Sequence, residues 1–322
     1  MRAVRITSLD GPDLVEYVEV DEPDAGPGDV VIEVAAAGVS FVDALMTRGL
    51  YQVRPELPFV PGVEVAGVVR SAPAGALVAA GDRCVAYVPI GGYAGVAVAA
   101  PEVTFPLPDE LSYAEGAALA MNFQTAWFAL VRRGRLRAGE HVLVLGAAGG
   151  VGTAAIQVAK GFGATVTAVV STTSKAEVAR QAGADHVVLA GEGWATQVRG
   201  GAGPVDVTVD SVGGEVFADA IRLLRAEGRH LVIGFAAGDI PTIALNRLLL
   251  KNIEVVGVYW GGFVEQDVSI AAEAAAVLTR LAREGVVKPV VGAVHALADA
   301  AKALTAVENR TAEGKLVLEI AP

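Results

Sequence analysis

The chain has 322 residues, of which 53% are hydrophobic, and it carries 25 Lys and Arg against 36 Asp and Glu. This composition predicts a folded, acidic, globular protein, and the length fits two domains of ordinary size. A formal charge of −11 argues against nucleic acid as a partner, and a single cysteine with four dispersed histidines argues against disulfide and zinc-cluster architectures.

The first part of the chain, up to about residue 120, predicts short strands separated by glycine and proline. It contains 11 of the 15 prolines. Short, closely spaced strands are typical of a small, mostly antiparallel domain. The predicted strands span residues 3–6, 15–20, 30–37, 62–70, 83–88 and 95–99.

From about residue 122, after a helical segment at 113–132, the pattern changes to strands that alternate with helices. This alternation predicts βαβ units and a parallel sheet. The predicted strands span 141–145, 165–170, 186–189, 205–210, 229–233 and 253–258, and the predicted helices between them span 152–162, 174–181 and 214–224. The C-terminal part predicts helices at 264–284 and 299–308 and a last strand at 315–320.

Neither the first residues nor the longest apolar stretches indicate a secreted or membrane protein. Residues 1–10 carry Arg2 and Arg5 but no apolar segment of the kind that a secretory signal needs, so we expect a cytoplasmic protein. Residues 84–101 and 142–159 are uncharged and long enough to imitate membrane spans, but glycine or proline interrupts both. We therefore expect no membrane partner.

The strongest local signal is a glycine-rich turn between a predicted strand and a predicted helix. The apolar strand at 141–145 runs directly into Gly146, Gly149, Gly150 and Gly152. Glycine lets the backbone approach a diphosphate closely, and the N-terminus of the following helix presents unpaired N–H groups to it. The spacing GxxGGVG departs from a strict GxGxxG, and the alternative is a tight turn that binds no ligand.

The residues after the second strand of this sheet, 165–170, indicate the preferred coenzyme. NAD-dependent enzymes usually place Asp or Glu there for the ribose 2′-hydroxyl, whereas this chain reads Ser171-Thr172-Thr173-Ser174-Lys175. Hydroxyl groups followed by a cation suit a 2′-phosphate, so we expect NADPH rather than NADH. The alternative is a helix N-cap rich in Ser and Thr with a solvated lysine, because Ser174 with Glu177 also forms a capping box.

Two later strands of the same predicted sheet also end in residues suited to line a coenzyme site. Asp210-Ser211-Val212-Gly213-Gly214 follows one strand, and Gly234-Phe235 follows the next. Ligands of open parallel sheets lie at the carboxyl ends of the strands. We interpret Ser211 as a residue that lines the dinucleotide site and Phe235 as a wall for the nicotinamide, while a simple turn remains the alternative for Asp210.

Further short motifs lie along nearly the whole chain: Ala37-Gly-Val-Ser-Phe-Val-Asp43, Arg48-Gly-Leu-Tyr51, Pro58-Phe-Val-Pro-Gly-Val-Glu64, Gly81-Asp-Arg83, Gly139-Glu-His-Val-Leu143 and Gly314-Lys315. Together with the glycine turn they resemble the medium-chain dehydrogenase/reductase superfamily, specifically the zinc-free quinone oxidoreductases that include zeta-crystallin. The resemblance implies an α/β fold with a GroES-like, mostly antiparallel β catalytic domain, 1–121 and 264–322, and a Rossmann domain with a doubly wound parallel sheet, 122–263.

The resemblance also implies that no metal is used. Zinc-dependent members of the superfamily carry a catalytic Cys and His and a loop of four further cysteines. This chain has Ser40 where the Cys is expected, Val63 where the His is expected, and no cysteine loop. Zinc-assisted chemistry is therefore disfavoured. Quinone oxidoreductases usually have Asn at the position of Ser40, so an amide contact near the nicotinamide is lost or replaced by a hydroxyl.

Coenzyme contacts follow from the resemblance position by position, and the reading of the strand ends adds Thr172 and Ser211 to them. Lys315 is a weaker candidate, which either reaches a coenzyme phosphate or starts an exposed strand. Trp260 has a core position as its alternative. The contacts implied by the resemblance are Thr125, Ala148, Gly149, Gly150, Val151, Ser171, Lys175, Phe235, Tyr259 and Trp260.

Hydride transfer requires a hydrogen-bond donor near the oxygen that becomes anionic, besides alignment of the reacting atoms. The candidate donors are Tyr51, Ser40 and Asn122. Tyr51 lies in a loop that the family places over the cleft, and it aligns with a tyrosine that resembles the proton donor of enoyl-thioester reductases. Its alternative role is a packing aromatic at the domain interface.

The resulting hypothesis is an NADPH-dependent, zinc-independent enzyme that transfers hydride from nicotinamide C4 to a quinone or a related α,β-unsaturated carbonyl compound. An enoyl-thioester reductase is the alternative enzyme; it should need a basic rim, for which Arg48, Arg54 and Arg247 are candidates. A non-catalytic NADPH-binding protein is the alternative from another class.

The last parallel strand, Ile253 to Val258, is strongly apolar and should lie at the edge of the sheet. Unprotected edge strands tend to pair with another chain. We therefore expect a homodimer through this strand, which is also the habit of the family.

Overall fold

The computed structural model describes residues 1–320, and these form two compact units. Unit 1 holds residues 1–121, 267–282 and 291–320, and unit 2 holds residues 122–266 and 283–290. Residues 264–266 and 283–290 lie in unit 2, whereas the range 264–322 was predicted for the catalytic domain; residues 321 and 322 of that range lie outside the described residues. The segment 283–290 is joined to unit 2 by the side-chain amide of Gln157, which bonds both backbone groups of Lys288.

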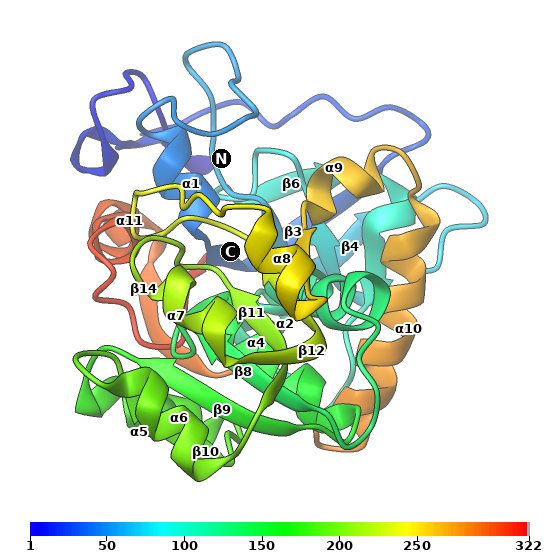
Figure 1. The fold of residues 1–322 in the computed structure, drawn as a ribbon. Coiled ribbons are helices and arrows are strands. Elements are labelled where there is room, and N and C mark those ends of the chain that lie inside the picture. The colour runs from blue at the N-terminus through cyan, green and yellow to red at the C-terminus, as the bar shows by residue number, and fades with distance from the viewer. Residues whose placement is uncertain (321–322) are drawn as a thin grey trace. The chain divides into compact units, whose positions relative to one another are not determined.

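Unit 2 is built on a six-stranded sheet whose strand pairs are all parallel. The order β10-β9-β8-β11-β12-β13 is that of the doubly wound dinucleotide-binding fold; Figure 1 labels β8 to β12. All five residues of β8 are buried, because helices cover both faces of such a sheet. The strands are β8 (His141–Leu145), β9 (Thr165–Val170), β10 (His186–Leu189), β11 (Val205–Asp210), β12 (Leu224–Val232) and β13 (Glu254–Gly257).

The helices of unit 2 pack their apolar sides against this sheet. Trp194 of α6 and Phe217 of α7 share one core cluster with Leu143 and Leu145 of β8. In α4 the residues from Gly152 to Ala159 are all buried, so this helix is fixed firmly to the sheet directly after the glycine turn. The helices are α3 (Gln124–Trp127), α4 (Gly150–Gly161), α5 (Thr173–Gln181), α6 (Trp194–Gly201), α7 (Val216–Leu223), α8 (Asn246–Lys251) and α9 (Trp260–Val264).

Unit 1 is mostly antiparallel, as its short strands predict. Its larger sheet has the order β14-β15-β3-β4-β5-β7, with β6 paired to β3, and only β14 and β15 run parallel. The strands are β1 (Arg2–Arg5), β2 (Glu16–Glu19), β3 (Val30–Val39), β4 (Glu64–Ser71), β5 (Arg83–Tyr87), β6 (Val96–Ala99), β7 (Thr104–Pro106), β14 (Val291–Ala296) and β15 (Lys315–Glu319). The helices are α1 (Phe41–Met46), α2 (Tyr113–Gly116), α10 (Ser269–Arg283) and α11 (Ala300–Glu308).

Two predicted helices differ in the structure. The segment 113–132 contains two π-helical turns, Leu119–Phe123 and Phe128–Arg133, on either side of α3. The helix predicted at 264–284 begins only at Ser269, as α10, where the Asp267 carboxylate accepts the Ser269 N–H, and Val264 is instead the last residue of α9. Helical periodicity does not mark such boundaries, since the apolar pattern continues across them.

Helices α1, α6, α8 and α9 were not predicted from the sequence. The segment that forms α6 is bounded by glycines, with Gly193 at its N-cap in a left-handed conformation and Gly200 and Gly201 at its end. Leu249 and Leu250 of α8 are exposed, so that helix has no buried apolar stripe to indicate it.

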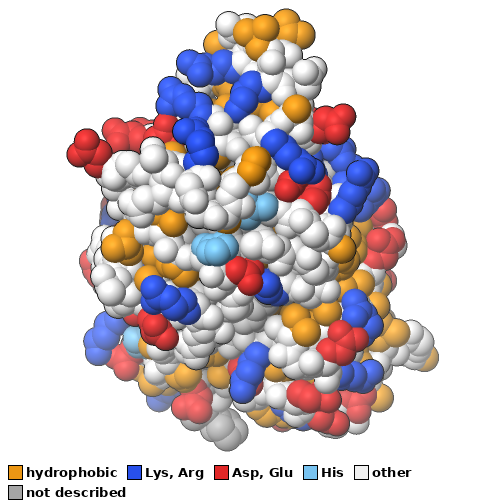
Figure 2. All heavy atoms as spheres, turned by 60° about the horizontal axis from the view of Figure 1, so that its bottom comes forward, with side chains coloured by type: hydrophobic (Ala, Val, Ile, Leu, Met, Phe, Trp, Pro, Cys, Tyr) orange, Lys and Arg blue, Asp and Glu red, His pale blue; other side chains and the backbone are white. Residues whose placement is uncertain are grey.

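The described residues present a surface of mixed charge. Figure 2 shows one face, on which Lys and Arg side chains are interspersed with Asp and Glu. Among residues 1–320 no helix combines the length and the apolar character needed to cross a bilayer. Cys84 is buried in β5, and burial raises the pKa of its thiol to about 12, so it is not a reactive group in the folded chain.

Candidate functional site

The glycine turn after β8 has a geometry that only glycine permits. Gly146 adopts a φ of 65°, in the left-handed region. A Cβ added to Gly152 would lie 2.3 Å from the carbonyl oxygen of Gly146 and 2.7 Å from the Cα of Ala147. The turn therefore folds back tightly on the first residues of α4, and a side chain at position 152 would force it apart.

The N-terminus of α4 is left open by this turn. Its N-cap residue is Gly149, which has no side chain to accept a hydrogen bond from the helix. The N–H groups of the first turn have no acceptor within a helix, so those of Gly150, Val151 and Gly152 are available to an anion. Because α4 has 12 residues, its N-terminus also carries the partial positive charge of a full helix dipole. This cradle fits a diphosphate.

Asn122 lies against the start of α4. A Cβ added to Gly150 would lie only 2.1 Å from the Asn122 side-chain nitrogen. The absence of a side chain at position 150 therefore lets this amide rest on the backbone of the cradle. Asn122, predicted as a donor to the acceptor oxygen, is thus placed beside the first turn of α4 by contacts within unit 2.

The sheet order brings the predicted coenzyme residues of unit 2 to one edge. Because β8 lies between β9 and β11, with β12 and β13 following, the residues after these strands form a row at their carboxyl ends. Ser211 reaches back to the last residue of β8, donating to the carbonyl of Leu145 at 3.4 Å. Phe235 and Tyr259 are 36% and 50% exposed, whereas Trp260 is 2% exposed and belongs to the core.

The hydroxyl-rich segment after β9 begins α5 earlier than predicted. Its N-cap is Thr172, whose hydroxyl accepts the N–H of Lys175 and contacts Ser174. The segment thus forms a hydroxyl N-cap, as the alternative interpretation expects, but the cap is Thr172 rather than Ser174, because the helix begins at Thr173 and places Lys175 at the third position. Ser171 to Ser174 are all exposed, so their hydroxyls are accessible at the carboxyl end of β9.

Asp210 has a structural role at the end of β11. One of its carboxylate oxygens accepts the N–H groups of Val212 and Gly213, each at 2.8 Å. The other oxygen lies 3.0 Å from Nε2 of the buried His230. Asp210 therefore shapes the turn that carries Ser211, which agrees with the simpler of the two interpretations of this residue.

Unit 1 contains a buried ion pair that includes one of the predicted catalytic residues. The ammonium group of Lys315, at the start of β15, donates to Oε1 of Glu64 and to Oγ of Ser40, the latter at 2.7 Å. The Ser40 hydroxyl donates to the same Glu64 oxygen at 3.0 Å, and the other Glu64 oxygen accepts the Met121 N–H at 2.9 Å. Lys315 is 3% exposed and Glu64 is fully buried, so Lys315 does not start an exposed strand.

A second buried acid stands beside this pair. Asp43 accepts the Ser40 N–H at 2.8 Å and the Tyr93 hydroxyl at 2.9 Å on one oxygen, and its other oxygen has no hydrogen-bond partner among the described residues. Burial raises the pKa of Asp43 to about 6, and this outweighs the opposing effects of the two hydrogen bonds and of the Lys315 charge. Asp43 therefore changes charge near neutral pH.

Asp43→Asn is expected to become more stable relative to the wild type as the pH rises from about 4 to about 7. A carboxyl whose pKa is higher in the folded state stabilises the fold fully below its unfolded-state pKa, and this contribution is lost as the pH rises through about 6. Asparagine can accept the same two hydrogen bonds without ionising. Urea unfolding across this range should show a relative gain on the order of 3 kcal/mol, and a pH-independent difference would contradict the assignment.

Tyr51 packs against apolar side chains of unit 1. It lies against a small cluster formed by Ile6, Met46, Phe59 and Val63. The neighbouring Arg54 donates to the Tyr51 carbonyl at 3.4 Å. This arrangement fixes the backbone at Tyr51 and leaves its role as a donor a prediction.

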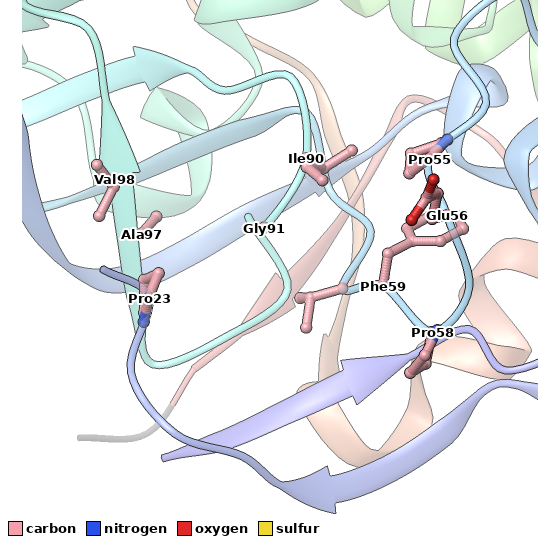
Figure 3. Close-up of a pocket in the computed structure, with 10 residues that line it drawn as sticks. Pro23, Pro55, Glu56, Pro58, Phe59, Ile90, Gly91, Ala97 and Val98 are labelled. Carbon is pink, nitrogen blue, oxygen red and sulfur yellow. The ribbon is translucent and has the colours of Figure 1, made fainter. Parts of the chain in front are cut away.

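A separate apolar cavity of about 420 Å³ lies in unit 1. Figure 3 shows Glu56, its only charged lining residue, beside Pro55 and Phe59, with Ile90 on the adjacent segment. None of the predicted site residues lines it.

Two family models match the chain. The first, described as "Alcohol dehydrogenase GroES-like domain", covers residues 26–109. The second, described as "Zinc-binding dehydrogenase", covers residues 150–277. These ranges fall in unit 1 and mainly in unit 2, respectively.

Full-length relatives make the assignment more specific. "Quinone oxidoreductase-like protein 2" of Rattus norvegicus is 36% identical, and the match covers 99% of this chain and 92% of that protein. A probable oxidoreductase from Mycobacterium abscessus is 47% identical with a TM-score of 0.91, covering 99% and 98% of the two chains. The quinone oxidoreductase from Thermus thermophilus, also solved in complex with NADPH, is 35% identical with a TM-score of 0.84, covering 99% and 100%.

The chain belongs to the quinone oxidoreductase branch of the medium-chain dehydrogenase/reductase superfamily. The resemblance noted from the short motifs is thereby confirmed, as is the fold class of a GroES-like domain with a Rossmann domain.

One of the two family models carries zinc in its description. Within residues 1–320 no group of three or more His, Cys, Asp or Glu side chains is arranged to hold a metal. Ser40 and Val63, which the resemblance aligns with zinc ligands, are a hydroxyl bonded to Glu64 and Lys315 and a buried apolar side chain.

Sequence reasoning missed Glu64, Asp43 and Tyr93 as members of a buried polar network. A signal for Glu64 was present, because it is the only charged residue in the apolar run from Phe59 to Val69. A carboxylate in such a run must be paired when it is buried. Its partner Lys315 lies 251 positions away, and nothing in the local sequence connects the two.

Proposed function

We propose that this chain is an NADPH-dependent, zinc-independent enzyme that reduces quinones or related α,β-unsaturated carbonyl compounds. The observation that carries the proposal is the cradle after β8, where Gly146 and Gly152 fold the backbone tightly onto an uncapped helix N-terminus. The relatives named quinone oxidoreductase, one of them solved with NADPH, support the choice of coenzyme and of acceptor class.

Residues of unit 2 would hold the coenzyme. The N–H groups of the first turn of α4 would bind the diphosphate. The exposed hydroxyls of Ser171 and Thr172, together with Lys175, would bind the 2′-phosphate. The remaining proposed contacts with the nicotinamide half are Thr125, Ala148, Ser211, Phe235 and Tyr259.

When bound, NADPH supplies the hydride. The residues of the chain then have to donate hydrogen bonds to the acceptor oxygen, which gains negative charge, and to keep water away from it. Ser40, Tyr51 and Asn122 are the proposed donors. No step requires a metal, and metal analysis that finds stoichiometric zinc in the purified protein would overturn this part of the proposal.

An enoyl-thioester reductase is less well supported, because one of the arginines expected at its basic rim is already bound. Arg48 forms two hydrogen bonds with Glu308, at 2.8 and 3.1 Å, and a third with the Asp10 carbonyl. Its guanidinium is therefore committed within unit 1 and does not offer a free charge to a carrier phosphate.

The proposed function is tested by mixing NADPH with the protein and following its oxidation with quinones, enones and enoyl thioesters. Turnover with quinones or enones at a higher kcat/KM than with enoyl thioesters is expected. Preference for enoyl thioesters would favour the alternative reductase. Tight binding of NADPH without oxidation by any acceptor would favour a non-catalytic NADPH-binding protein.

Lys175→Ala is expected to raise KM for NADPH about tenfold and to leave KM for NADH within twofold, because a single charge-assisted contact with the 2′-phosphate is lost. Steady-state kinetics with NADPH and with NADH measures the two KM values and their ratio. Lys160→Ala is the matched control, because it also removes a lysine of unit 2, one whose ammonium group pairs with Asp185. An equal effect on both nucleotides would remove Lys175 from the 2′-phosphate site.

We also propose a homodimer formed through β13. This strand is at the edge of the six-stranded sheet, and Leu249 and Leu250 of the preceding helix α8 are 74% and 77% exposed. Light scattering at micromolar concentration is expected to give twice the mass of one chain. The Leu249→Asp variant is expected to have the mass of a single chain. Leu77→Asp, at an exposed leucine of unit 1, should leave the mass unchanged; a monomeric wild type would refute the dimer.

A further inference from the structure

The buried pair of Lys315 and Glu64 has a third member, the Ser40 hydroxyl. Burying two charges costs more than it returns unless their remaining hydrogen-bonding positions are satisfied. Here Glu64 is satisfied at both oxygens by Lys315, Ser40 and the Met121 N–H. Ser40 is the most accessible of the three side chains, at 7% exposure against 3% and 0%.

The hydrogen bonds leave the Ser40 proton free to change partner. Its hydroxyl oxygen accepts from Lys315 while its proton points to Glu64. If the hydroxyl rotates towards another acceptor, Glu64 keeps its bonds to Lys315 and Met121, so no buried charge becomes unpaired. The hydrogen bond from the Lys315 ammonium to the Ser40 oxygen persists in that arrangement. It polarises the Ser40 O–H group, which then donates to the new acceptor.

The Lys315 side chain is held so closely that it has little freedom to reach elsewhere. A Cβ added to Gly38 would lie 2.7 Å from both the Lys315 Cε and the Glu64 carboxylate, so the two chains fill the space over that glycine. With its ammonium bonded to two side chains of unit 1 and 97% of its surface covered, Lys315 is poorly placed to bind a coenzyme phosphate.

We propose that Lys315 and Glu64 are positioning residues that make the Ser40 hydroxyl a strong hydrogen-bond donor to the acceptor oxygen. The inference rests on the proposed function and deepens it. The acceptor it fits is a quinone or enone whose oxygen gains negative charge as hydride arrives, because a polarised hydroxyl stabilises that charge more than it stabilises the neutral carbonyl. Lys315 then acts through Ser40 and makes no contact with the coenzyme.

The test compares three variants with the wild type: Ser40→Ala, the charge-free pair Lys315→Met with Glu64→Gln, and all three changes together. Removing both charges avoids leaving an unpaired carboxylate in the core. Lys302→Met is the control for loss of a lysine in the same unit, since Lys302 is exposed and bonds only Asp299 among the described residues. For each protein, kcat is measured with a series of substituted p-benzoquinones, and the NADPH Kd is measured by fluorescence without an acceptor.

Ser40→Ala is expected to lower kcat about 100-fold, as loss of one donor at a developing oxyanion does. The charge-free pair is expected to lower it about tenfold, and the combined variant is expected to be no slower than Ser40→Ala. All NADPH Kd values should stay within twofold of the wild type. The losses should be largest for electron-rich quinones, whose reduced oxygen is least stabilised by the ring.

Other results would overturn the inference. A tenfold rise in the NADPH Kd of the charge-free pair with an unchanged kcat would assign Lys315 to a coenzyme phosphate. Additive losses in the combined variant, or equal losses for every quinone, would show that the pair acts independently of Ser40. If the wild type binds NADPH but reduces no acceptor, the proposed function fails and this inference with it.

Discussion

Replacing Gly152 by alanine is expected to weaken NADPH binding by about 100-fold, which corresponds to about 2.7 kcal/mol. The new Cβ would lie 2.3 Å from the carbonyl oxygen of Gly146, a distance that backbone atoms cannot accept. The turn would have to move away from α4, and the N–H groups of its first turn would no longer converge on one point. Because the rest of α4 is anchored by buried residues, the damage should stay local.

Isothermal titration with NADPH measures the effect directly. Gly200→Ala is the matched control, because it adds the same methyl group to another helix of unit 2 where no atom lies within 4 Å of the new Cβ. The control should bind NADPH like the wild type and unfold at the same or a slightly higher temperature. If Gly152→Ala binds NADPH normally, the cradle is not the diphosphate site and the proposed coenzyme position would be wrong.

Lys315→Met alone is expected to destabilise the protein by about 3–5 kcal/mol, because it leaves the Glu64 carboxylate buried without its counter-charge. Adding Glu64→Gln should recover most of this loss, since a neutral amide can still accept the hydrogen bonds of Ser40 and Met121. Glu64→Gln is thus expected to raise the free energy of unfolding of the Lys315→Met variant and to lower that of the wild type.

Chemical denaturation of the four proteins, the wild type, each single variant and the pair, gives the coupling free energy of the two residues. A value above about 2 kcal/mol is expected for a pair that is this deeply buried. If the single variant Lys315→Met is as stable as the wild type, then Glu64 is not charged in the native state, and the ion pair is not what holds β15 to β4.

The unit 2 sheet could be predicted strand by strand, because strands buried on both faces appear as continuous apolar runs such as His141–Leu145, with helices between them. The edge position of β13 followed from the same order. The π-helical turn Leu119–Phe123 could not be predicted, since it changes the hydrogen-bond spacing without changing the apolar pattern.

The candidate site was predictable in the part formed by local sequence. The glycine turn, with Gly146 to Gly152, lies in one short segment, so its strand and helix context could be seen directly. The network of Ser40, Glu64 and Lys315 depends on pairings between strands far apart in the chain, β15 with β3 and β3 with β4. The sequence allowed Ser40 and Lys315 to be predicted separately as site residues. Only the registers of β15 with β3 and of β3 with β4 show that the two side chains are in contact.

The bond between Lys315 and Ser40 joins positions 275 residues apart, and most of unit 2 is encoded between them. During synthesis, the Rossmann-type sheet can therefore pack while β15 is still inside the ribosome. The GroES-like unit, although its first strands emerge earliest, cannot form the bonds of Lys315 with Glu64 and Ser40 until β15 has emerged. We therefore expect the inserted unit to fold before the unit that surrounds it in sequence.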